Sequence, residues 1–243
     1  MIYFDPVTMM FNLRKKFLNA SSFFVGCVLI SLFVNLAFNA YLGNRLSLAQ
    51  YSLIAFISTL LNISNVVFGA ISSTVTYHVG YLTSRFGKGI GKSIHNRAYR
   101  KLMIPVALFS IGWLGLSGQI SSFFHIKELL PVIMFFPVFA LGFFAAVSEG
   151  YLKGRFLFYF VGAIYLIEPL AKFALGSYFI AYHPELVYLA IPLATLTSSV
   201  LAMLFSIFIS RNDEDHSRHN QKLSIGFFLA SLLTSFSSVA FLS

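Results

Sequence analysis

The chain has little charge and almost no cysteine. Only 10% of its 243 residues are Asp, Glu, Lys or Arg, whereas 58% are hydrophobic. Cys27 is the single cysteine, which excludes an internal disulfide. The six histidines are scattered, and only His216 and His219 have a spacing that would suit a metal. Because this pair lies in a polar stretch, we interpret it as solvent-exposed and expect neither a metal site nor a cofactor.

What the chain has in abundance is long apolar stretches. Each contains about 20 residues or more, which as a helix crosses a hydrocarbon core of about 30 Å. Lipid offers no hydrogen bonds to the backbone, so each stretch is predicted to be helical. We therefore predict an all-α, polytopic membrane helix bundle with six transmembrane helices plus a seventh at the C-terminus. The seven stretches are 21–43, 51–76, 102–124, 129–148, 156–182, 186–210 and 223–243.

Lysine and arginine are concentrated in alternate gaps between these stretches. The N-terminal segment and the second, fourth and sixth gaps together hold 14 of them, whereas the odd-numbered gaps hold two. Cytoplasmic loops are enriched in Lys and Arg, so the N-terminus is predicted to be cytoplasmic, with Lys127 and His183 facing outward. The net charge of +9 does not indicate a nucleic-acid partner, because the cations flank apolar stretches, where they set topology and touch anionic lipid headgroups.

The distribution of polar residues predicts how the chain is organised. Aromatic residues and methionines are mixed with three cations before the first apolar stretch, which favours a segment lying on the cytoplasmic leaflet. Residues 80–101 are predicted to form a flexible basic loop. We expect four parts: an interfacial cytoplasmic segment (1–20), a six-helix transmembrane lobe (21–210), a cytoplasmic linker (211–222) and a seventh transmembrane helix (223–243) that begins a missing second lobe and packs poorly against the six.

Catalytic groupings are nearly absent. The sequence Gly-Leu-Ser-Gly at 115–118 resembles the nucleophile motif of rhomboid intramembrane proteases. Serine chemistry needs a histidine within hydrogen-bond reach, and the three apolar stretches between residues 129 and 210 contain none. We predict that the chain is not an enzyme and keep a rhomboid-like protease as a remote alternative. Gly112, Gly115 and Gly118 are interpreted as a small-residue face for close helix packing.

The fifth apolar stretch carries Glu168, Pro169 and Lys172 near its centre. A charge at mid-membrane costs about 2.5 to 3.5 kcal/mol on insertion scales, whereas an acid–base pair four residues apart on an exposed helix recovers only about 0.5 kcal/mol. Both charges are therefore expected to face protein or a water-filled cavity. Pro169 removes the hydrogen bond to the carbonyl of Tyr165 and is expected to kink the helix. We favour a titratable, cationic point on a translocation path over a structural ion pair.

Other polar and helix-bending residues are less informative. Glu149 and Lys153 are also four apart, but they lie at the predicted cytoplasmic end of the fourth stretch, where we interpret them as a pair at headgroup level. Bent helices suit a protein that changes shape, and further prolines occur inside the apolar stretches at Pro105, Pro131, Pro137 and Pro192.

The order of these features resembles the oligosaccharide-lipid flippases of bacterial O-antigen and capsule synthesis, which belong to the multidrug, oligosaccharidyl-lipid and polysaccharide exporter superfamily. Residues 42–52, Leu-Gly-Asn-Arg-Leu-Ser-Leu-Ala-Gln-Tyr-Ser, are similar to the family's short outer loop. The similarity continues through a long second helix, a basic inner loop, the opening of the fifth helix at 154–156 and a basic residue inside that helix, Lys172. In the outer loop, Ala49 and Gln50 replace the usual acids, and serines replace two common glycines.

The resemblance implies a function and roles for individual residues. It implies flipping of undecaprenyl-pyrophosphate-linked oligosaccharide from the inner to the outer leaflet of the bacterial inner membrane, with no covalent step. In that reading Lys172 attracts the anionic head, Glu168 tunes it or carries a coupling proton, and Arg45 serves the outer mouth. The family resembles two six-helix lobes around a central cavity, so we expect this chain to be truncated or completed by a second lobe or another copy. A multidrug or other small-molecule exporter of the same superfamily is the alternative.

Overall fold

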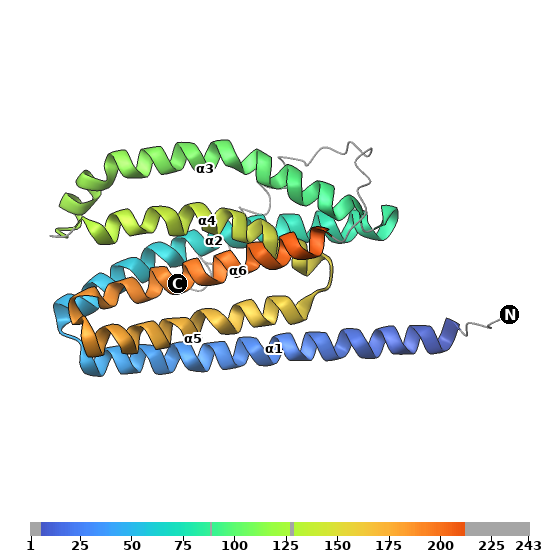
Figure 1. The fold of residues 1–243 in the computed structure, drawn as a ribbon, viewed down its shortest axis with the longest axis horizontal. Coiled ribbons are helices and arrows are strands. Elements are labelled where there is room, and N and C mark those ends of the chain that lie inside the picture. The colour runs from blue at the N-terminus through green and yellow to red at the C-terminus, as the bar shows by residue number, and fades with distance from the viewer. Residues whose placement is uncertain (1–5, 88, 127–128, 212–243) are drawn as a thin grey trace, which may run out of the picture.

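The protein is an all-α helix bundle, described here by a computed structural model that covers residues 6–87, 89–126 and 129–211, with side chains from residue 18 onward (Figure 1). No strand occurs in these ranges. Six helices are long and apolar enough to cross a membrane, which confirms a polytopic membrane bundle. The elements are α1 (Pro6–Arg45), α2 (Leu48–Phe86), α3 (Gly89–Phe123), α4 (Leu130–Gly154), α5 (Phe158–Tyr182), the 3-10 helix η1 (Pro184–Leu189) and α6 (Ala190–Arg211).

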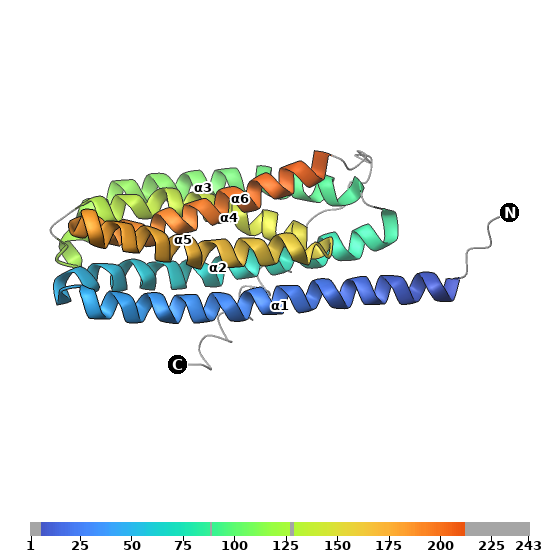
Figure 2. The ribbon, with the colours of Figure 1, turned by 60° about the horizontal axis from the view of Figure 1, so that its bottom comes forward.

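Several predicted parts lie outside the described residues. These are the seventh helix at 223–243, the linker after Arg211 and the outward-facing Lys127. The segment predicted to be interfacial is described from Pro6, and its backbone belongs to the same continuous helix as the first transmembrane stretch. This N-terminal part of α1 extends past the end of the bundle (Figure 2).

The first four helices, α1 to α4, are longer than the apolar stretches from which they were predicted. The predicted flexible loop at 80–101 is wrong, because α2 continues to Phe86 and α3 begins at Gly89. The 39 residues of α2 span about 58 Å at 1.5 Å per residue, about twice the hydrocarbon thickness. Hydropathy reports only the part of a helix that suits lipid, whereas the backbone hydrogen bonding continues into the polar zone. Gly87, with φ of 88°, ends α2 in a backbone conformation that favours glycine.

The turn between α1 and α2 is set by a capping box. Ser47 Oγ accepts from the backbone N–H of Gln50 at 3.4 Å, and Gln50 Oε1 accepts from the backbone N–H of Ser47 at 3.1 Å. Gln50 Nε2 also donates to the carbonyl of Pro184 at 3.0 Å, which ties the start of α2 to η1. Residues 47–50 therefore hold one end of the bundle together.

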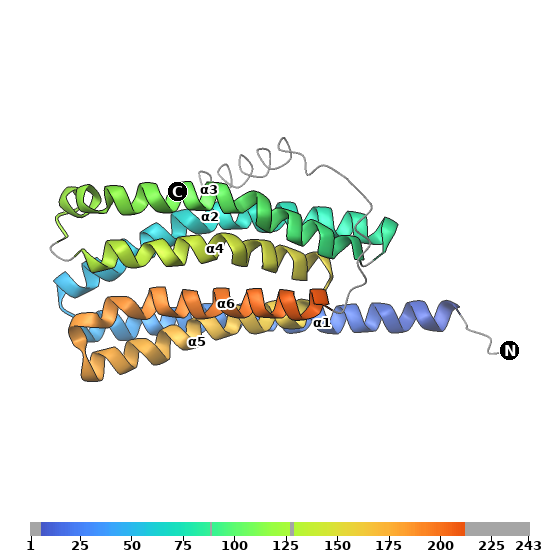
Figure 3. The ribbon, with the colours of Figure 1, turned by 45° about the horizontal axis from the view of Figure 1, so that its top comes forward.

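The six helices form two groups (Figure 3). One contains α2, α3 and α4, the other α1, α5 and α6, and the groups are joined mainly by the packing of α4 against α6. α1 packs along α5 and makes at most slight contact with α2, although only two residues separate these helices. The side of the bundle between α1 and α2 is thus the least closed.

Glycines allow α2 and α4 to approach closely. A Cβ on Gly150 would lie 2.5 Å from the carbonyl oxygen of Ser72 and 2.8 Å from Val75 Cβ, and a Cβ on Gly154 would lie 2.7 Å from Val79 Cβ. Close backbone approach is the usual function of small residues between membrane helices.

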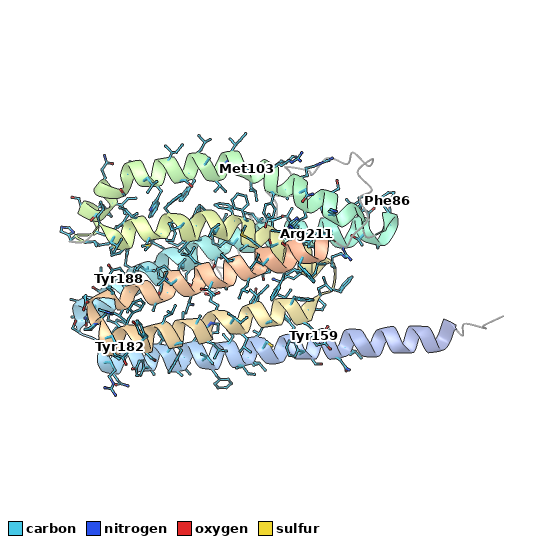
Figure 4. All side chains as sticks on the ribbon, viewed as in Figure 1. Phe86, Met103, Tyr159, Tyr182, Tyr188 and Arg211 are labelled. Atoms are coloured by element: carbon cyan, nitrogen blue, oxygen red, sulfur yellow. The ribbon has the colours of Figure 1, made fainter. Side chains whose placement is uncertain are left out.

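The glycine face predicted on α3 is not a packing face within the described bundle. A Cβ on Gly112, Gly115 or Gly118 would have nothing within 4 Å. Spacing of three residues places side chains on one helix face but does not determine what that face meets. Earlier in α3, Met103 (labelled in Figure 4) is 60% exposed, as expected of a lipid-facing side chain.

Candidate functional site

A polar cavity of about 840 Å³ lies among α1, α2, α4, α5 and α6. A second cavity, of about 330 Å³, adjoins it, because both are lined by Asn35, Asn65, Glu168, Lys172 and Thr195. We call them the large and the small cavity. Lipid-facing surfaces avoid polar groups, so a polar tract of this size inside an apolar bundle marks a candidate site. The ionisable and phenolic groups that line the large cavity are Glu149, Lys153, Tyr165, Glu168, Lys172 and Tyr77.

Glu168 and Lys172 form an ion pair on the wall of both cavities. They stand two residues on either side of Leu170, the central residue of α5, and the Lys172 Nζ to Glu168 Oε1 distance is 3.1 Å. Their side chains are 33% and 17% exposed. The four-residue spacing places both on one face of α5, which the fold turns toward the cavities. This arrangement spares both charges a lipid environment.

Two hydroxyl groups of α6 approach the same carboxylate. Thr195 Oγ1 lies 3.4 Å from Glu168 Oε1, and Ser198 Oγ lies 3.4 Å from Glu168 Oε2, within donating distance. Each hydroxyl also has a carbonyl of its own helix as an acceptor, Ile191 at 3.1 Å for Thr195 and Thr195 at 3.0 Å for Ser198. Thr195 and Ser198 are three apart and therefore share a face of α6. Glu168 consequently keeps polar neighbours on a second helix even when its contact with Lys172 is lost.

A second acid–base pair lines the large cavity. The expected headgroup-level pair, Glu149 and Lys153, lies in its wall, with 2.6 Å between Lys153 Nζ and Glu149 Oε1 and side chains 22% and 25% exposed. Lys153 Nζ also donates to the hydroxyl of Tyr165 at 3.4 Å and lies 5.4 Å from the centre of its ring. Tyr165 precedes Glu168 by three residues, so one face of α5 connects the two pairs.

The structure brings together three of the four predicted site residues. Pro169 is buried on α5 beside Glu168 and lines the large cavity with it. Arg45 does not line either cavity and is exposed at the end of α1, 6.0 Å from the Tyr41 ring. It is ten residues, or about 15 Å, along α1 from Asn35.

Four asparagines on the cavity walls were not singled out from the sequence. Asn35 and Asn39 are one turn apart on α1, and Asn62 and Asn65 are one turn apart on α2; all four line the small cavity. The available signal was an amide pair at helical spacing within each of two apolar stretches. Amides are costly in lipid unless they are hydrogen-bonded, so such pairs indicate a polar surface.

The motif considered for catalysis is not assembled in the described part of the chain, and the pair His216 and His219, considered for metal binding, lies outside the described residues. Ser117 Oγ donates to the carbonyl of Leu114 at 2.7 Å, a bond within its own helix. His95, on the same helix, is 22 residues or about 33 Å away from Ser117. Among the described residues, no group of three or more His, Cys, Asp or Glu side chains could hold a metal ion.

Comparisons with protein-family models, with curated proteins and with solved structures gave no match to this chain. Its character as a multi-pass membrane protein rests on six apolar helices long enough to span a bilayer. Arguments about its function rest on the two adjoining cavities and the charged groups on their walls.

Proposed function

We propose that the chain is a membrane transporter, or one lobe of one, that flips a polyprenyl-pyrophosphate-linked oligosaccharide across the bacterial inner membrane. The N-terminus lies in the cytoplasm, and the substrate moves from the inner to the outer leaflet. The single observation that carries this proposal is the Glu168–Lys172 pair, placed at the centre of a membrane helix on the wall of a large polar cavity. The resemblance in the order of sequence features gives the substrate class.

The cavity offers the polar head of such a lipid an alternative to the apolar core. Lys172 supplies positive charge and three donors to the phosphate oxygens, and these charge-assisted bonds are about twice as strong as neutral ones. The polyprenyl tail is apolar and remains in lipid, so the cavity has to open sideways. α1 and α2 both line it and have at most slight mutual contact, which supports an opening between them.

Glu168 provides a route for coupling transport to protons. A diphosphate that binds Lys172 displaces the carboxylate of Glu168 and is repelled by it while the carboxylate is charged. Protonation of Glu168 removes the repulsion, and Thr195 and Ser198 keep the group in place. Proton uptake at Glu168 and head-group binding at Lys172 thereby favour each other.

A small-molecule exporter of the same superfamily is the second candidate. It is favoured by the exposure of the pair, because the Glu168 side chain is 33% exposed and the Lys172 side chain only 17%. A carboxylate that is more accessible than its partner ammonium suits an organic cation better than an anion.

The experiment compares the wild type with Lys172→Gln in proteoliposomes. We expect the wild type to bind and flip a fluorescent farnesyl-pyrophosphoryl N-acetylglucosamine, scored with a membrane-impermeant quencher, and Lys172→Gln to lose both activities. The matched control is Lys101→Gln, which removes a charge from an exposed position of α3 outside the cavities. Ethidium transport without glycolipid binding would identify the exporter instead. Wild-type binding and flipping by Lys172→Gln would contradict the proposal.

A further inference from the structure

The small cavity holds amide groups that the described part of the protein leaves without partners. Asn35 Nδ2 donates to the carbonyl of Ser31 at 3.0 Å, which leaves its Oδ1 free to accept. The side chains of Asn39, Asn62 and Asn65 make no hydrogen bond to any described residue. All four amides thus have hydrogen-bonding capacity to spare within one cavity.

Asn35, Asn62 and Asn65 lie near the middle of the apolar stretches 21–43 and 51–76, whereas Asn39 lies nearer the end of the first. Asn35 is ten residues from the end of α1 at Arg45, and Lys172 is ten residues from the end of α5 at Tyr182. Ten residues of helix measure about 15 Å, half of a hydrocarbon core of about 30 Å. An amide without partners at that depth is costly in lipid, so the cavity has to contain water or a polar ligand.

The chemistry of the wall indicates which ligand fits. A side-chain amide carries two donors and an acceptor without net charge, and a hydroxyl group is both donor and acceptor, so the two are complementary. A site for an anionic group would be lined by cations. Among the described residues, the only cation that lines the small cavity is Lys172, which the small cavity shares with the large one. The volume of about 330 Å³ is within the range of small-molecule pockets, which is about 300 to 1,000 Å³.

We propose that the small cavity is a sugar subsite, in which Asn39, Asn62 and Asn65 hydrogen-bond the hydroxyl groups of the glycan. This inference rests on the proposed function and adds a division of tasks, in which Lys172 recognises the diphosphate and the asparagines recognise the sugar. In a polyprenyl-pyrophosphate glycan the first sugar is attached directly to the outer phosphate. The two cavities share Lys172 and Glu168, so adjoining subsites match adjoining parts of one molecule.

The test separates the sugar from the diphosphate by using two probes, farnesyl pyrophosphate and farnesyl-pyrophosphoryl N-acetylglucosamine, with the full chain in nanodiscs. We expect the wild type to bind the sugar-bearing probe about tenfold more tightly, the gain that one or two net hydrogen bonds provide. In the double variant Asn39→Leu/Asn62→Leu, whose two positions line the small cavity and not the large one, this gain disappears, while the affinity for farnesyl pyrophosphate is unchanged. Unchanged binding of that probe also shows that the variant is folded.

A control and the contrary outcomes complete the experiment. Asn44→Leu removes an exposed amide that donates to the carbonyl of Ala40 and does not line either cavity, so it should keep the tenfold gain. Equal wild-type affinities for the two probes would overturn the sugar subsite and leave the proposed function standing. Binding of neither probe would overturn the proposed function itself. If the wild type forms dimers, binds both probes equally and loses its dimers in the double variant, the amides belong to an interface between copies. That result would also overturn the subsite.

Discussion

The two faces of α2 differ in how tightly they are packed. Toward α4, glycines bring the helices so close that a Cβ on Gly150 would meet the backbone of Ser72. Toward α1, the same helix makes at most slight contact, and its polar residues Asn62 and Asn65 line a cavity. The first face is expected to provide stability, and the second leaves space for a ligand.

The comparison shows that the structural role of a small or polar residue in a membrane helix depends on which face of the helix carries it. Gly150 on α4 is a packing residue, whereas Gly115 on α3 faces open space. Glu168 and Lys172 are tolerated at mid-membrane because they line the cavities on the side of the bundle between α1 and α2. A charge buried in the α2–α4 seam would have no room for water. Substitutions at the two faces of α2 are therefore expected to differ in their effect on stability.

The largest effect is expected at the tight face. Gly150→Ala places a Cβ about 2.5 Å from a backbone oxygen that cannot move independently, so we expect a loss of about 3 kcal/mol, the upper end for overpacking. Gly115→Ala is the matched control and should be neutral or stabilising by up to about 1 kcal/mol through helix propensity. Thermal unfolding in detergent measures both. Equal stability of the two variants would show that α2 and α4 do not pack as described.

An intermediate effect is expected from Lys172→Ala. Breaking a fully buried pair costs about 3 to 5 kcal/mol, but Glu168 is one-third exposed and keeps Thr195 and Ser198, so we expect about 2 kcal/mol. The double variant Glu168→Leu/Lys172→Met should recover stability without recovering glycolipid flipping. A double variant that is stable and still flips the lipid-linked glycan would assign the pair a structural function only.

A smaller effect is expected from the hydroxyl groups on α6. Thr195→Val removes one donor to the Glu168 carboxylate at 3.4 Å and should cost about 0.5 to 1 kcal/mol. Thr197→Val is the matched control, because Thr197 is exposed and donates only to the carbonyl of Leu193 in its own helix. Unfolding in the two variants should differ in the presence of Glu168 and become alike in the Glu168→Leu background, where no carboxylate is left to accept from Thr195. An undiminished difference in that background would show that Thr195 acts independently of the pair.

The number and type of the described helices could be predicted from hydropathy, but the residues at which they begin and end could not. An apolar stretch identifies a helix because lipid leaves the backbone no other partner. Hydropathy does not detect the part of a helix that lies outside the hydrocarbon. It therefore predicts a loop at residues 89–101, which in the structure begin α3. The seam between α2 and α4 was likewise not foreseen, because glycines on α3 and α4 look alike in the sequence.

The candidate site divides in the same way. Glu168 and Lys172 could be singled out because two charges in an apolar stretch are costly wherever they lie. The sequence could not show that Lys153 and Asn62 lie in the same site as Glu168 and Lys172. Tertiary packing fixes the rotation of α4 and α2 about their axes, and this rotation decides which side chains face the cavities. Helical spacing places residues on a common face of one helix, and only the fold decides which faces of different helices meet.

The most direct measurement of the central claim is whether the α1–α2 side of the bundle holds water at mid-membrane. In a Cys27→Ala background, Asn62→Cys and Ile63→Cys place thiols on adjacent residues of α2, the first on the small cavity and the second on a 60% exposed position outside both cavities. Maleimides react with the thiolate, which forms only in contact with water. In native membranes with a water-soluble maleimide on both sides, we expect Asn62→Cys to react at least about tenfold faster than Ile63→Cys. Equally slow labelling of both positions would contradict a water-filled cavity and the transport path built on it.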